Sequence, residues 1–220
     1  GSVGSCAGTA SYRVNVAVAP SVTAVAGSAS VCSGASATLT ANGAETYNWS
    51  NTLGATQTVS VTPTSTSTYT VTGTSAEGCI GTASVAVTVN PNPTLTAVGS
   101  TICEGNSAQI SASGASDYIW DNGLASGASK AVTPNQTTSY TVTGTDANGC
   151  TATASATVTV NSNPTVALTA NPATICSGSN STLSATGATT YNWSTTGSGI
   201  SQTVTPNQTT SYTVTGTDAN

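Results

Sequence analysis

The sequence contains no histidine, methionine or phenylalanine, and only 4% of its 220 residues carry a charge. Without histidine, the chain has no imidazole for a Ser-His-Asp triad or for general acid–base catalysis near neutral pH. The seven acidic residues are scattered and form no close recurring pair, so we interpret them as turn residues and solvated surface. The composition therefore predicts a protein that is not an enzyme and that uses no cofactor and no bound metal.

Basic residues are also nearly absent, because Arg13 and Lys130 are the only two and the net charge is −5. Binding to a phosphate backbone requires a basic surface, so no nucleic-acid partner is expected. No apolar run approaches the ~20 residues of a membrane span, so no span is expected in this segment. Residues 1–19 lack the charged start and apolar core of a signal peptide, and we expect the chain to start inside a longer protein.

Threonine, serine, valine, alanine and glycine dominate the sequence, and a long segment of it is repeated. Val132–Asn148 recurs unchanged at Val204–Asn220, and a diverged copy occupies Val61–Glu77. The cysteines at 32, 103 and 176 recur at spacings of 71 and 73 residues. A period of this length exceeds that of solenoid repeats and favours small tandem domains. We predict repeats over 20–91, 92–162 and 163–220, the third lacking its last strand.

Within the second repeat, alternation of apolar and polar residues predicts a series of short strands. They are expected at residues 94–98, 106–113, 117–121, 129–134, 139–147 and 150–160. Asn148-Gly149 predicts a two-residue hairpin turn with positive φ at both positions. Short strands separated by turns indicate an all-β fold of tandem immunoglobulin-like β-sandwich domains in a linear string.

The expected core of each repeat combines an apolar residue, a strand tryptophan and a Tyr-x-Val pair. These residues are Leu39, Trp49, Tyr69 and Val71, then Ile110, Trp120, Tyr140 and Val142, and finally Leu183, Trp193, Tyr212 and Val214. Carbohydrate-binding platforms are the alternative for the Tyr-x-Trp pairs. The position of the tryptophans in the repeat favours the core.

Residues 1–19 resemble a last strand without its domain, because Cys6–Val18 aligns with Cys79–Val89. Two interpretations remain open. In one, the chain is a window of a longer repeat protein. In the other, copies join head to tail, and this polymerisation strand completes the third repeat of a neighbour as a donated strand. Its candidate residues are Cys6, Tyr12, Val14, Val16 and Val18.

Six cysteines with regular spacing and no Cys-x-x-Cys pair favour disulfides over a metal site. The candidates are Cys6, Cys32, Cys79, Cys103, Cys150 and Cys176. An inter-domain pairing of Cys32 with Cys150 is favoured, because Cys32 and Cys79 are expected at opposite ends of one sandwich. Cys103 would then reach a cysteine that follows Asn220, or Cys6 of a neighbour. The alternative is an intradomain pairing of the type Cys32–Cys79.

The motifs Cys-Ser/Glu-Gly, Tyr-x-Trp and Val-Thr-Pro…Tyr-Thr-Val-Thr-Gly-Thr, followed by an Asn-Pro linker, cover essentially the whole chain. This pattern resembles the Ig-like and PKD-like repeats of Bacteroidetes secreted cell-surface proteins, which are associated with gliding motility and type IX secretion. The resemblance implies an extracellular, cell-surface location and a structural or adhesive role. We expect a filament or stalk whose partners are further copies of the chain. The alternative is an adhesin or carbohydrate-binding module that contacts surface glycans or other cells.

Overall fold

The computed structural model describes residues 4–194 and 197–219, and strands are the only regular secondary structure in these ranges. The predicted all-β class is confirmed. Among the described residues, no helix is long and apolar enough to cross a membrane. Residues 1–3, 195, 196 and 220 belong to the predicted segments 1–19 and 163–220 but lie outside the described ranges.

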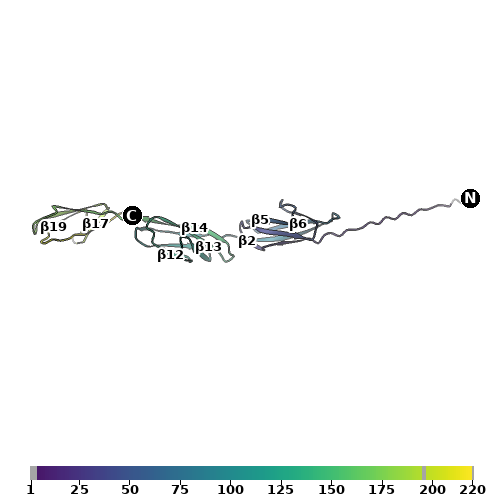
Figure 1. The fold of residues 1–220 in the computed structure, drawn as a ribbon, viewed down its shortest axis with the longest axis horizontal. Coiled ribbons are helices and arrows are strands. Elements are labelled where there is room, and N and C mark those ends of the chain that lie inside the picture. The colour runs from purple at the N-terminus through teal and green to yellow at the C-terminus, as the bar shows by residue number, and fades with distance from the viewer. Residues whose placement is uncertain (1–3, 195–196, 220) are drawn as a thin grey trace. The chain divides into compact units, whose positions relative to one another are not determined.

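The first repeat is a β-sandwich of two sheets (Figure 1). Its strands are β1 (Thr23–Ala26), β2 (Ser30–Cys32), β3 (Ala37–Asn42), β4 (Thr46–Trp49), β5 (Thr58–Val61), β6 (Ser67–Thr74) and β7 (Ile80–Asn90). One sheet has the order β1-β3-β5, and the other has the order β2-β7-β6-β4. All pairs are antiparallel except β2 with β7, which is parallel. This is the strand arrangement of an immunoglobulin-like sandwich.

The second repeat has the same arrangement, with sheets β12-β10-β8 and β11-β13-β14-β9. Its strands are β8 (Thr96–Val98), β9 (Thr101–Cys103), β10 (Ala108–Ser113), β11 (Asp117–Trp120), β12 (Ser129–Val132), β13 (Thr138–Thr145) and β14 (Thr151–Asn161). Neither β9 nor its equivalent β2 is among the strands that the residue pattern predicts. Each has only three residues and pairs in parallel with the last strand of its repeat, so no local alternation marks it.

The third repeat has two three-stranded sheets, β15-β16-β19 and β18-β17-β20. Its strands are β15 (Ala167–Asn171), β16 (Ser181–Thr186), β17 (Thr190–Trp193), β18 (Gly197–Ser198), β19 (Ser201–Val204) and β20 (Val214–Thr217). In the described residues of this repeat, no strand lies beside β20 on the side away from β17. Ile175 and Cys176 occupy the positions of β2 and β9 but form no strand.

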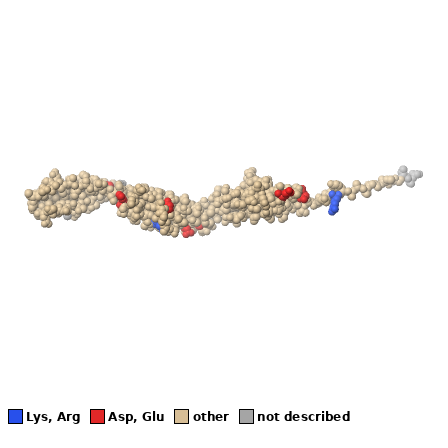
Figure 2. All heavy atoms as spheres, viewed as in Figure 1, with Lys and Arg blue, Asp and Glu red and all other residues tan. Residues whose placement is uncertain are grey.

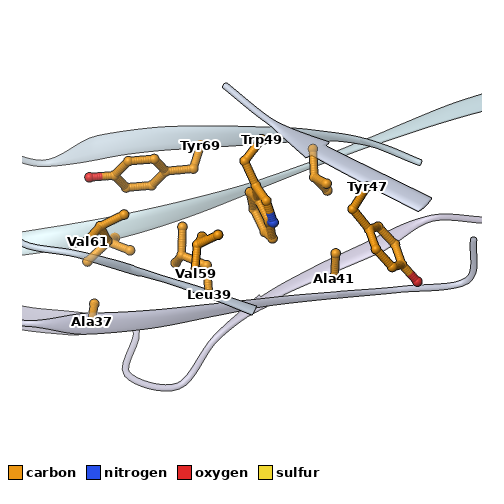
Figure 3. Close-up of a cluster of buried hydrophobic side chains, with 10 residues drawn as sticks. Ala37, Leu39, Ala41, Tyr47, Trp49, Val59, Val61 and Tyr69 are labelled. Carbon is orange, nitrogen blue, oxygen red and sulfur yellow. The ribbon is translucent and has the colours of Figure 1, made fainter. Parts of the chain in front are cut away.

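Each sandwich encloses its own cluster of buried apolar side chains, and each cluster draws its residues from one predicted repeat. Inward residues alternate with outward ones along each strand, as the period of two requires. Figure 3 shows the first cluster, in which Trp49 and Leu39 lie between the two sheets. Leu39, Ile110, Val71 and Val142 are fully buried. The predicted domain boundaries themselves remain predictions.

The chain divides into two compact units that do not coincide with the repeats. The first unit is Gly1–Thr94 with Thr145–Ala152, and the second is Leu95–Gly144 with Thr153–Asn220. The turn that precedes β14 therefore belongs to the same compact unit as the first sandwich. Charged side chains are few on the face shown in Figure 2, which agrees with the composition.

Candidate functional site

A disulfide joins Cys32, at the end of β2, to Cys150, directly before β14. The Cα atoms are 5.5 Å apart, within the usual range for a disulfide. Both cysteines lie in the first compact unit, yet they come from different repeats. Of the two pairings that the sequence left open, the structure therefore has the one between consecutive repeats.

The position of Cys32 follows from the parallel pairing of β2 with β7. Cys32 lies opposite Asn90, the last residue of β7. Cys79 precedes the first residue of the same strand, and the eleven residues of β7 span about 36 Å at 3.3 Å per residue. Cys32 and Cys79 thus lie at opposite ends of the sandwich. The Sγ atom of Cys150 lies 3.9 Å from the carbonyl oxygen of Asn90, beside Cys32.

The side chain of Asp146 holds Cys150 in position. Its Oδ1 accepts hydrogen bonds from the backbone N–H groups of Asn148 and Cys150, each at 2.9 Å. The N–H of Gly149 donates to the carbonyl of Asp146, so Ala147 and Asn148 occupy the centre of the turn. Only Gly149 has a positive φ, of 80°. The prediction of a two-residue turn at Asn148-Gly149 is wrong, because the aspartate favours a type I turn followed by a left-handed glycine.

The other four cysteines are free thiols in the part of the chain that the structure describes. Cys6 and Cys176 are exposed, whereas Cys79 and Cys103 are half-buried. No group of three or more cysteine or acidic side chains among the described residues could hold a metal ion.

The Tyr-x-Trp pairs face the interior of the sandwiches. Trp49, Trp120 and Trp193 are at most 4% exposed, and each indole N–H donates to a backbone carbonyl of a nearby loop. The tyrosine hydroxyls also bond to backbone groups three residues upstream, as when Tyr191 accepts from the N–H of Ala188 at 2.7 Å. These rings are therefore not available as an open platform for a sugar.

The third repeat has an open sheet edge at β20, which has four residues where β6 and β13 have eight. Tyr212 and Val214 are half-buried at this edge. The residues equivalent to Val214 in the first and second repeats, Val71 and Val142, are fully buried. A groove of about 440 Å³ lies beside this edge. Its lining includes Ile175, Cys176, Leu183, Val204, Pro206 and Tyr212.

The predicted polymerisation strand is unpaired in this chain. Residues 4–19 contain no strand, and all of them are exposed. Tyr12 is 92% exposed and Val14 is 76% exposed, although both sit in an alternating pattern typical of a half-buried strand. Val16 and Val18 are exposed to a similar degree. The donated-strand role of these residues therefore stays a prediction.

No family model matches the chain, and no curated protein matches it. Similar solved structures include the N-terminal eight immunoglobulin domains of Down Syndrome Cell Adhesion Molecule, at 14% identity and a TM-score of 0.36. That match covers 78% of this chain and 33% of the other chain. A Ca²⁺-stabilised adhesin with which an Antarctic bacterium binds ice is 16% identical, with a TM-score of 0.42 and coverage of 87% and 65%.

Another solved structure, of a 1.5-MDa bacterial ice-binding adhesin, is 16% identical, with a TM-score of 0.30 and coverage of 84% of this chain and 82% of that one. Sequence identities and TM-scores as low as these do not indicate a function for this chain. The immunoglobulin-like sandwich is established here by strand order and register.

Proposed function

We propose that these repeats form a structural region of an extracellular filament or cell-surface stalk and perform no catalysis. The observation that supports this proposal is the disulfide between Cys32 and Cys150, because it ties a strand of one repeat to a turn of the next. Disulfides persist in oxidising compartments, which supports an extracellular location. A chain with only one lysine and one arginine also offers few cleavage sites to trypsin-like proteases.

In such a region the bond would limit how far the chain can be stretched. It closes a loop across 118 positions of the sequence, which includes most of both sandwiches. A pulling force applied beyond both cysteines cannot extend the residues between them, even when those residues unfold. The bond thus limits the length that the chain gains under load.

An adhesin or carbohydrate-binding module is the second candidate function. The burial of Trp49, Trp120 and Trp193 weighs against it, because these are the only tryptophans available for stacking on a sugar. The repetition of Val132–Asn148 at Val204–Asn220 also favours a structural role, since specific recognition tends to require distinct loops.

Single-molecule force spectroscopy on the full chain, held by handles at both ends, tests the proposal. In the oxidised protein we expect resolved unfolding events, with a total extension shorter by about 40 nm than in Cys32→Ser/Cys150→Ser, since an extended residue spans up to ~3.6 Å. The matched control, Cys6→Ser/Cys176→Ser, should keep the short extension. In Cys32→Ser/Cys150→Ser, where every repeat can extend, extension without a resolved force peak would overturn the structural role. So would specific, saturable binding on a glycan array that leaves the folded repeats unchanged, which favours the adhesin.

A further inference from the structure

The six cysteines fall into two classes, defined by their position in the repeat. The strand cysteines end β2, β9 or the equivalent segment of the third repeat; they are Cys32, Cys103 and Cys176. The turn cysteines precede β7, β14 or the equivalent segment near the N-terminus; they are Cys79, Cys150 and Cys6. In the observed bond, the strand cysteine of one repeat joins the turn cysteine of the following repeat.

The segment that contains Cys6 matches the last strands of the other repeats without a gap. Residues 6–22 align position by position with 79–95 and 150–166, including the linker into the next repeat. The equivalent positions are Cys6 with Cys79 and Cys150, Val14 with Val87 and Val158, Val16 with Val89 and Val160, and Pro20 with Pro93 and Pro164. Residues 6–19 are therefore joined to the first repeat by the same kind of linker that joins the last strand of each repeat to the next repeat.

This segment also complements the groove of the third repeat. Val87 and Val158 are fully buried, so Val14 is the residue expected to fill the groove. In the first repeat Tyr69 lies opposite Val85, which places Tyr12 opposite Tyr212, a residue of the groove lining. Arg13 falls at an outward position, where its charge stays in solvent.

The same register extends to the strand cysteine. Val31 pairs with Val89 and Cys32 with Asn90 in the first repeat. The equivalent pairs are Ile175 with Val16 and Cys176 with Ala17. Ile175 and Cys176 form no strand in this chain, which agrees with the absence of a strand beside them.

We propose that Cys6–Ala17 of one copy completes the third repeat of a second copy, and that two disulfides lock this joint. Cys6 bonds Cys103 of the second copy, and Cys79 bonds Cys176 of the second copy. Both bonds follow the pattern of Cys32–Cys150, in which a strand cysteine meets the turn cysteine of the next repeat. The proposal rests on the proposed filament function, and it pairs every cysteine of the chain.

Each bond forms by thiol–disulfide exchange with a small disulfide such as oxidised glutathione. The Cys6 thiolate attacks one sulfur of oxidised glutathione and releases the first glutathione thiolate. The Cys103 thiolate of the second copy then attacks the Cys6 sulfur and releases the second one. The two cysteine thiols lose two protons and two electrons in total, and one oxidised glutathione is reduced to two thiols.

The test mixes ¹⁴N-labelled and ¹⁵N-labelled copies of the 220-residue chain and oxidises the mixture with a glutathione buffer. We expect a non-reducing gel to show a ladder in steps of 21.2 kDa that reductant collapses to one band. Mass spectrometry should find Cys6–Cys103 and Cys79–Cys176 peptides, about half of them with mixed isotopes because partners are drawn at random. Cys103→Ser/Cys176→Ser should abolish the ladder, and Cys32→Ser/Cys150→Ser should keep it.

A second pair of variants separates strand donation from random cross-linking. Val14→Asp places a charge in the groove and should reduce the ladder at least tenfold, because a buried unpaired charge is costly. Val18→Asp is the matched control, since Val18 aligns with the exposed Pro91 and Ser162, beyond the ends of β7 and β14, and should leave the ladder intact. Val14 is already exposed in this chain, so neither change should unfold the repeats.

Three results would overturn the proposal: a monomer only, a ladder equally strong in Val14→Asp, or linked peptides confined to one isotope. None of them bears on the force measurement, which concerns a bond within one chain. Failure of the joint and failure of the structural role are therefore distinguishable.

Discussion

The second and third repeats share an unchanged segment of sequence but differ in structure along it. Val132–Asn148 and Val204–Asn220 are identical, yet β13 has eight residues and β20 has four. In the second repeat β14 lies beside β13, whereas no described strand lies beside β20 on that side. The first half of β13 therefore forms because β14 lies beside it, since the same residues form no strand in the third repeat.

The difference is confined to one side of the third sandwich. Val214 and Tyr212 are half-buried, while their equivalents Val142 and Tyr140 are buried. Trp193 remains buried, at 4% exposure, and β17 still pairs with β20. The missing neighbour thus opens the sandwich beside Tyr212 and leaves the region around Trp193 closed.

Supplying the neighbour should have the largest effect. We expect a chain extended after Asn220 with the sequence of Gly149–Asn161, with serine in place of its cysteine, to form the full eight-residue strand. The two added inward valines are equivalent to Val158, which is fully buried, and Val160, which is half-buried. Their burial should stabilise the third repeat by about 2 to 4 kcal/mol, since full burial of one valine contributes roughly 1.5 to 3 kcal/mol. Hydrogen exchange of the Tyr212 and Val214 amides measures the gain.

The control for this extension carries aspartate at the position equivalent to Val158. It has the same length and the same backbone hydrogen-bonding groups, but its charged side chain cannot fill the apolar groove. Equal protection of Tyr212 in both extended chains would mean that backbone pairing alone, without burial, orders the strand.

A matched pair of substitutions tests whether a buried valine and an exposed valine at equivalent positions contribute differently to stability. Val158→Ala should destabilise the second repeat by about 2 kcal/mol, because it removes two buried carbon groups and leaves a cavity. Val14→Ala, at the equivalent position, should change stability by less than about 0.5 kcal/mol in dilute, monomeric chain. Urea unfolding followed by hydrogen-exchange mass spectrometry reads each repeat separately. A comparable loss in Val14→Ala would show that residues 4–19 are packed within the chain.

The sequence predicted most of this architecture because most of its strands are specified locally. Alternation around Leu39 and Trp49 places one face of each strand in the core, and the repeat extends the interpretation to all three sandwiches. The favoured cysteine pairing rested on the expected strand register, which places Cys32 and Cys79 at opposite ends of one sandwich, and the structure has that pairing and not the intradomain alternative.

The features that the sequence did not predict depend on contacts between distant residues. Strands β2 and β9 have no alternation of their own and form by pairing with β7 and β14, nearly 60 residues away. The turn before Cys150 depends on a side-chain hydrogen bond of Asp146 that competes with the Asn-Gly preference. The open edge at β20 lies in a segment identical to a closed one, so no residue within it marks the difference.

The smallest expected effect tests whether the closed half of the third repeat is as well ordered as that of the second. Tyr191 exchanges two hydrogen bonds with Ala188, at 2.7 and 2.8 Å, and Tyr118 exchanges two with Ala115, at 2.9 and 2.8 Å. Tyr191→Phe and Tyr118→Phe should each cost about 1 to 2 kcal/mol, because both partners of the hydroxyl lose a hydrogen bond. Equal losses of stability, read by hydrogen exchange for each repeat, would mean that the missing strand affects only the groove side of the third repeat. A negligible loss in Tyr191→Phe alone would mean that the missing neighbour loosens the whole sandwich.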